Sequence, residues 1–205
     1  MGKGLFPGQA SSLERLLALT DGIYAIVLTL LVLDLKIPEA LKVSDAELVK
    51  DLVAQMPNFI AYFISFVVIV IFWMRNHWIL KPLAKGNETV FWLNLFHLFF
   101  LSLIPYTSSL IGHYERDSLA VMFFSGSLGL SGLSLLFLHR YVSTKPEWLG
   151  ENPGNAWTTP NWWIDYPTPI VALGSIGLAF INIYAALGIW MLAPIWGSLV
   201  LVFRR

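Results

Sequence analysis

The chain of 205 residues contains no cysteine and few charged residues. The lack of cysteine excludes disulfides, thiolate chemistry and cysteine-based zinc or iron–sulfur sites. Charged residues make up only 13% of the chain, and the formal net charge is zero, with basic residues scattered along it. A nucleic-acid partner is therefore not expected, since it needs a clustered basic surface. Apolar residues are abundant instead, at 57%, and the mean hydropathy is +0.67, which is typical of a protein in a lipid bilayer.

The apolar residues gather in six segments that approach the length of about 20 residues needed to cross the hydrocarbon core. They lie at 17–37, 53–74, 90–111, 118–139, 168–186 and 188–203. A tight turn at 185–188 is expected to separate the last two, and Pro194 is expected to bend or break the final helix. An acidic loop is expected at 38–52 and a long aromatic loop at 140–167. The sequence thus predicts a single all-α, polytopic membrane domain over residues 1–205.

The distribution of lysine and arginine predicts the orientation of this domain. With six spans both termini share one side, which carries nine basic residues against four on the other side. The nine are Lys3, Arg15, Arg75, Lys81, Lys85, Arg140, Lys145, Arg204 and Arg205, and the four are Lys36, Lys42, Lys50 and Arg116. Basic residues favour the cytoplasmic side, so both termini are expected in the cytoplasm.

Two charged residues, Arg15 and Asp21, lie at the start of the first apolar segment. They are six residues apart, whereas partners on one helix need a spacing of three or four, so they cannot pair with each other. Each needs a partner elsewhere, because an unpaired charge in lipid is costly. The candidates at the same boundary of the membrane are polar residues of the second and third segments: Arg75, Asn76, His77, Asn94 and His97.

A buried polar network that joins the first three segments is the simplest account of these residues. In the alternative, Asn94 and His97 are ordinary packing residues and Arg15 reaches the lipid headgroups. Beyond Asp21, one helical face of the first segment carries Gly22, Ile26, Thr29 or Leu30, and Leu33. A stripe that faces lipid has the same pattern, so periodicity alone leaves a pore lining and a lipid-facing surface both open.

The motif Arg15-x-x-x-Leu19-Thr20-Asp21 resembles the Arg-x-x-x-Phe-Ser-Asp signature of the transmembrane protein 175 family of potassium channels. This sequence has Leu19 in place of the phenylalanine of the signature and Thr20 in place of the serine, which keeps the hydroxyl.

The third apolar segment extends the resemblance. Its residues Trp92-Leu-Asn94-Leu, followed by the Pro-Tyr-Thr of segment 103–110, are similar to the third span of that family, and His77 after Trp73 also fits. The likeness covers most of residues 13–140.

The resemblance implies a fold of six helices with both ends in the cytoplasm and no filter loop of the Thr-Val-Gly-Tyr-Gly type. A single repeat implies a bacterial homotetramer in the inner membrane, with a pore lined by the first helix of four subunits. Carried over by position from Asp21, a narrow hydrophobic ring falls on Ile26, a hydroxyl layer on Thr29 and a further apolar ring on Leu33. Potassium is then the permeant ion, held transiently near Thr29, and no cofactor is expected.

The same polar residues are also compatible with functions other than a potassium channel. A proton-coupled transporter or a proton-permeable channel would use Asp21, His77 and His97 as a relay, because acid and imidazole groups inside a membrane are typical of proton transfer. An enzyme is not expected, since the sequence contains no nucleophile–base arrangement and no metal-ligand spacing.

Overall fold

The computed structural model describes residues 9–35, 44–114, 117–150 and 166–192, and these are largely helical. Within the described residues the extended pairing is limited to an isolated bridge between Leu83 and Leu149, so the prediction of an all-α fold is confirmed. Four helical segments in this part of the chain are long and apolar enough to cross a membrane. They are Ser12–Asp34, Met56–Leu80, Glu88–His113 and Ser118–Ser143.

The first three of these segments contain helices α1, α3, α4 and α5. Helix α1 (Gln9–Leu30) continues into a 3-10 turn, Leu31–Asp34, and α3 spans Met56–Leu80. The third segment is divided at Leu103 into α4 (Glu88–Ser102) and α5 (Ile104–His113). The division follows from Pro105, which lies in the first turn of α5 and lacks the N–H that would continue the hydrogen bonds of α4.

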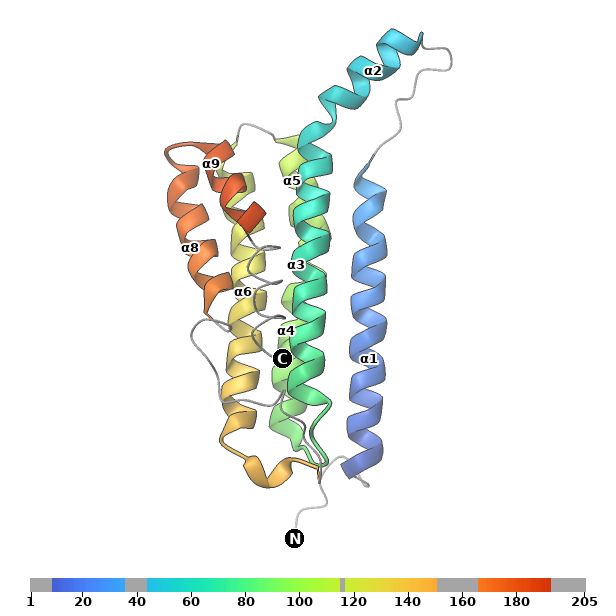
Figure 1. Ribbon diagram of the computed structural model, residues 1–205, viewed down its shortest axis with the longest axis vertical. Helices are drawn as coiled ribbons and strands as arrows, with labels where there is room; N and C mark the ends of the chain where they lie inside the picture. The colour runs from blue at the N-terminus through green and yellow to red at the C-terminus, as the bar shows by residue number, and fades with distance from the viewer. Residues whose placement is uncertain (1–8, 36–43, 115–116, 151–165, 193–205) are drawn as a thin grey trace.

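Helix α6 (Ser118–Ser143) lies at the centre of the bundle and packs against α4, α5 and α8 (Pro167–Ala179). Small residues permit the close approach of α6 and α8, because a Cβ added at Gly129 would lie 2.6 Å from Ala172 Cβ. Helix α1 packs on α3 and α4 at one edge of the bundle, and α8 lies at the opposite edge (Figure 1). Among the described residues, one side of α1 is therefore left without a neighbour.

The segment predicted at 168–186 is broken in the structure. It forms α8, which ends at Ala179, and α9 (Ile183–Gly188), which a 3-10 turn, Ile189–Leu192, follows. The turn expected at 185–188 is wrong, since the chain turns at 180–182. Asn182 explains the position, because its side chain accepts a hydrogen bond from Ala185 N at 3.0 Å and so begins a new helix. Most of the segment at 188–203, including Pro194, lies outside the described residues.

The predicted loops are shorter than expected. The acidic loop at 38–52 contains helix α2 (Asp45–Ala54), and the second span, predicted to end at 74, continues to Leu80. It continues because Arg75 and Asn76 are buried against neighbouring helices instead of marking a loop. In the loop predicted at 140–167, Pro146–Trp148 forms a 3-10 turn, whereas Trp157, Trp162 and Trp163 lie outside the described residues.

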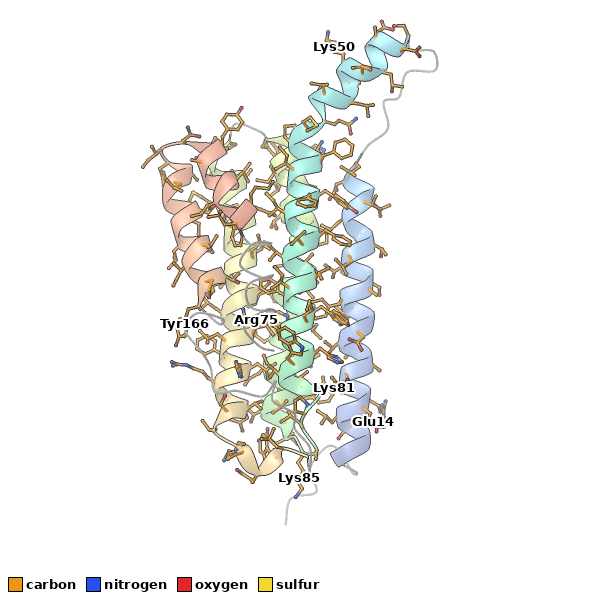
Figure 2. All side chains as sticks on the ribbon, in the orientation of Figure 1. Glu14, Lys50, Arg75, Lys81, Lys85 and Tyr166 are labelled. Atoms are coloured by element: carbon orange, nitrogen blue, oxygen red, sulfur yellow. The ribbon has the colours of Figure 1, made fainter. Side chains whose placement is uncertain are left out.

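The charged side chains labelled in Figure 2 lie mainly at the ends of the bundle. Glu14, Lys81 and Lys85 lie at one end and Lys50, on α2, at the other. Arg75 is the labelled exception, since it is buried within the bundle.

Candidate pore face and interhelical polar network

Helix α1 has two distinct faces. The buried face packs on α3 and α4 through Leu13, Leu16, Thr20, Tyr24, Val27 and Leu31. The uncovered face carries the residues singled out in the sequence: Arg15, Leu19, Gly22, Ile26, Thr29, Leu30 and Leu33. Exposure is high along this face, at 59% for Ile26 and 70% for Leu33. At 100° per residue, Arg15, Gly22 and Ile26 lie within about 40° of one another, so the uncovered face is a straight stripe along the helix.

Thr29 supplies the polar group in the middle of this stripe. Its hydroxyl donates back to the carbonyl oxygens of Ile26, at 2.9 Å, and of Ala25, at 3.1 Å. The proton is thus held by the helix itself, and the lone pairs of Oγ1 remain available on the exposed side. An oxygen in this state can accept from water or coordinate a cation, and it offers no donor to an anion.

On the opposite face, Thr20 belongs to a chain of buried hydrogen bonds between α1, α4 and α3. Asn94 Nδ2 donates to Thr20 Oγ1 at 2.8 Å, and Thr20 Oγ1 donates to the carbonyl oxygen of Leu16 at 2.7 Å. Asn76 Nδ2 in turn donates to Asn94 Oδ1 at 2.7 Å. Each of these hydrogen bonds is buried, so the chain connects three helices away from solvent.

A second buried chain starts at Tyr24 and ends on α6. The Tyr24 hydroxyl is 2.6 Å from His97 Nε2, and His97 Nδ1 is 3.0 Å from the carbonyl oxygen of Ser131 and 3.0 Å from Ser134 Oγ. Because a carbonyl oxygen only accepts, Nδ1 of the neutral ring carries the proton, and Nε2 accepts from Tyr24. The ring of His97 is further enclosed by Phe72, which meets it edge-on.

Asp21 lies at the border between the two faces of α1. It is exposed and accepts a hydrogen bond from Trp73 Nε1 of α3 at 2.8 Å. The Trp73 ring stacks at a tilt on His77, with 5.8 Å between the ring centroids. His77 Nδ1 is buried without a hydrogen-bond partner among the described residues.

The structure brings some of the candidate residues together and leaves others apart. Thr20, Asn76 and Asn94 share one chain of hydrogen bonds, His97 belongs to the other, and Asp21 and His77 meet through Trp73. Arg15 and Leu19 lie on the uncovered face instead, and none of the described residues forms an ion pair or hydrogen bond with Arg15.

Sequence reasoning missed the part played by Tyr24. It follows Thr20 by four residues and so shares its buried face, and this spacing could have shown that a second polar side chain of α1 faces α4.

Among the described residues no group of three or more histidine, cysteine, aspartate or glutamate side chains is placed to hold a metal ion. From Gly22 to Leu33, the uncovered face carries a single hydroxyl oxygen among apolar side chains.

The long apolar helices and the buried interhelical hydrogen bonds define a polytopic helical membrane protein. The family model described as endosomal/lysosomal potassium channel TMEM175 matches residues 15–105. A potassium channel of Chryseobacterium sp. (strain P1-3) is 30% identical over 185 residues, which are 89% of this chain and 91% of that protein. The chain therefore belongs to the TMEM175 family, as its sequence motifs predict.

Two further comparisons describe its place among known proteins. The crystal structure of a lysosomal potassium-selective channel TMEM175 homolog from Chamaesiphon minutus matches with a TM-score of 0.75 and 24% identity, covering 92% of this chain and 97% of that one. This likeness shows the fold. The endosomal/lysosomal proton channel TMEM175 of Mus musculus is 30% identical over 151 residues, which are 66% of this chain and 30% of that protein.

Proposed function

We propose that this chain forms a potassium-selective cation channel in which four copies surround a central pore lined by α1. The observation that carries the proposal is the uncovered stripe of α1 from Gly22 to Leu33, which lies opposite a well-packed face. The bacterial relative that matches nearly the full chain is named a potassium channel, which supports the same function. The described residues of one chain do not enclose a pathway along the stripe, so assembly around it completes the pore.

The chemistry of the stripe suits passive permeation of a weakly hydrated cation. Four copies of Ile26 make an apolar ring, and such a constriction can close a pore by dewetting. Four Thr29 oxygens, each with its proton held by the helix, replace part of the hydration shell of an ion in the next layer. Gly22 and Leu30 flank these layers, and Leu33 adds a second apolar ring. Potassium loses its water more readily than sodium, so it is favoured.

The remaining features of the proposal concern the subunit in its membrane. The chain crosses the bacterial inner membrane six times, with both termini in the cytoplasm, and the homotetramer needs no cofactor besides the permeant ion. The four long apolar segments, with the shorter apolar helices Pro167–Ala179 and Ile183–Leu192, support this topology. The lysines of Figure 2 also agree with it, since Lys81 and Lys85 lie at the end of the bundle assigned to the cytoplasm.

Proton permeation is the second candidate, and a specific arrangement favours it. The hydrogen bonds from Tyr24 through His97 to Ser134 form a continuous buried chain, and the matched mouse protein is named a proton channel. This chain starts on the buried face of α1, about 140° round the helix from Thr29, so protons would follow a route separate from that of potassium.

Reconstitution into liposomes tests both functions. Vesicles that contain the purified protein are placed in potassium, sodium or proton gradients, and flux is followed with ion-sensitive dyes. The proposal predicts a flux that grows linearly with the gradient, faster for potassium than for sodium. Saturable flux with a fixed ratio of protons to cations would instead identify a proton-coupled transporter.

A further inference from the structure

Helix α2 has a defined start but little cover from the other described residues. It begins with a capping box in which Glu47 N donates to Ser44 Oγ, while the Glu47 carboxylate accepts from Ser44 N at 3.0 Å and from Ser44 Oγ at 2.9 Å. None of its ten residues is buried in the single chain. The capping box stabilises the start of α2, and the exposed side chains along the helix leave a surface that a partner can bind.

One side of α2 is apolar. At 100° per residue, Leu48, Val49, Leu52 and Val53 fall within an arc of about 140°. The most exposed of them are Val49, at 60%, and Val53, at 62%. Burial of this apolar arc against a partner stabilises the complex by about 25 cal/mol for each Å² removed from water.

The position of α2 places this apolar arc outside the hydrocarbon core. Helix α3 alone has 25 residues and is about 37 Å long, which exceeds the hydrocarbon thickness of about 30 Å. Because α2 precedes α3, it extends beyond the membrane at the end of the bundle opposite Lys81 and Lys85. Figure 1 shows α2 leaning past the end of α1, away from α4, α6 and α8.

The charges of α2 argue against a helix that lies flat on the lipid surface. Interfacial helices carry lysine and arginine on the polar face, where they attract anionic headgroups. Helix α2 instead has three acidic residues, Asp45, Glu47 and Asp51, and one basic residue, Lys50. Its leaning direction and its charge both point to protein as the partner, on the side of the chain where α1 is also uncovered.

We propose that the α2 helices of adjacent copies pack against one another through this apolar arc and form a collar around the outer mouth of the pore. The inference rests on the proposed function, since it needs copies arranged around α1. The arc of α2 then adds contacts between copies at one end of the pore that α1 lines. The opposite side, with Glu47, Lys50 and Asp51, faces water.

The absence of cysteine makes a direct test possible, because a single introduced thiol is the only one in the chain. The full-length protein is prepared with Val49→Cys or Val53→Cys, on the apolar arc, and with the matched controls Lys50→Cys or Ala54→Cys on the opposite side. Each variant is reconstituted in liposomes at high dilution, oxidised with copper phenanthroline or treated with a short bis-maleimide, and run on non-reducing gels. Leu33→Cys, on the uncovered stripe of α1, reports separately on the assembly of the pore.

The collar predicts that the variants at residues 49 and 53 form covalent dimers severalfold more efficiently than those at residues 50 and 54. Equal cross-linking on both sides of α2 overturns it, since the helix would then have no preferred face. Cross-linking at residue 33 alone would overturn the collar and still support a pore shared between copies. The absence of cross-linking at every position would reject both the collar and the shared pore. Quenching of a fluorophore on residue 53 by brominated lipid, without cross-links there, assigns α2 to the membrane surface and also overturns the proposal.

Discussion

Asn94 of α4 donates a hydrogen bond to the hydroxyl of Thr20 on α1 at 2.8 Å, and both side chains are buried. Thr20 and Asp21 are consecutive residues of the motif at the start of α1, yet they bind different helices. Thr20 turns inward to α4, and Asp21 accepts from Trp73 on α3. The motif thus joins α1 to two neighbours within a single turn of helix.

Removing the side chain of Asn94 is expected to destabilise the fold. Asn94→Ala leaves Asn76 Nδ2 and Thr20 Oγ1 without their buried partner, at a cost of about 1–3 kcal/mol. The melting temperature of the detergent-solubilised protein measures the loss. Ser102→Ala is the control, because that hydroxyl is exposed and bonds only within its own helix. Equal melting temperatures for Asn94→Ala and the wild type would show that the chain of hydrogen bonds contributes no stability.

Asp21 is expected to hold α1 against α3 by accepting a hydrogen bond from the indole of Trp73. Asp21→Asn keeps an oxygen that can accept from Trp73 Nε1, whereas Asp21→Ala removes it. Only the alanine variant should lower the yield of assembled protein, as measured by size-exclusion chromatography with light scattering, while the potassium-to-sodium preference of the assembled fraction stays unchanged. A normal yield of Asp21→Ala with altered ion preference would place Asp21 in the permeation path.

Ile26 is expected to set the conductance. Ile26→Asn gives the narrow ring a polar lining, which removes the barrier to wetting, so currents of potassium and sodium should both rise severalfold. Single-channel recording in planar bilayers measures the change. The control is Val27→Ala, one residue away on the buried face, which should leave conductance near the wild-type value. Unchanged conductance in Ile26→Asn would mean that the constriction lies elsewhere on α1.

Thr29 is expected to support the preference for potassium. Thr29→Ala removes four oxygens from the pore and leaves it open, so the potassium-to-sodium permeability ratio should fall. Thr29→Ser retains the oxygen and should keep most of the preference. Reversal potentials under bi-ionic conditions decide between these outcomes. A wild-type ratio in Thr29→Ala would contradict the assignment of the hydroxyl layer.

Acid is expected to loosen α2. The two hydrogen bonds from Ser44 lower the pKa of Glu47 below its ordinary value of 4.5. A lowered pKa in the folded state means that the cap stabilises α2 fully above pH 4.5 and loses this effect as the pH falls through the folded value. As the pH falls below 4.5, hydrogen exchange of the α2 amides should therefore accelerate relative to exchange of the α6 amides. Glu47→Ala should exchange fast at neutral pH and show a weaker dependence on acid.

The close packing of α6 against α8 is an example of a feature that the sequence indicates. Glycine and other small residues recur in both segments, a pattern that favours close helix packing, and the structure places Gly129 against Ala172. The segments with long apolar runs were found because hydropathy is a property of whole stretches, and Asn94 and His97 stood out because polar residues are rare inside them.

The break in the last apolar segment could not be predicted from the sequence in the same way. Asn182 ends one helix and starts the next, but its effect depends on a side-chain cap and on Ser175, whose hydroxyl bonds the carbonyl oxygen of Ala186 at 2.7 Å. Those contacts exist only after the two helices fold against each other. Arg15 shows the converse case: its charge suggested a buried partner, and only the packing of α1 revealed that its side of the helix is uncovered.

The hydrogen bonds of α1 to its neighbours have a mechanical consequence. Thr20, Asp21 and Tyr24 hold the helix to α4 and α3 within five residues. From Ala25 to Leu33 the only polar side chain is Thr29, and its hydrogen bonds stay within α1. Between Tyr24 and Leu33, α1 is therefore held to its neighbours by apolar contacts, which permit small sliding movements. In the proposed tetramer, such a movement changes the width of the rings of Ile26 and Leu33, while the hydrogen bonds of Thr20, Asp21 and Tyr24 stay in place.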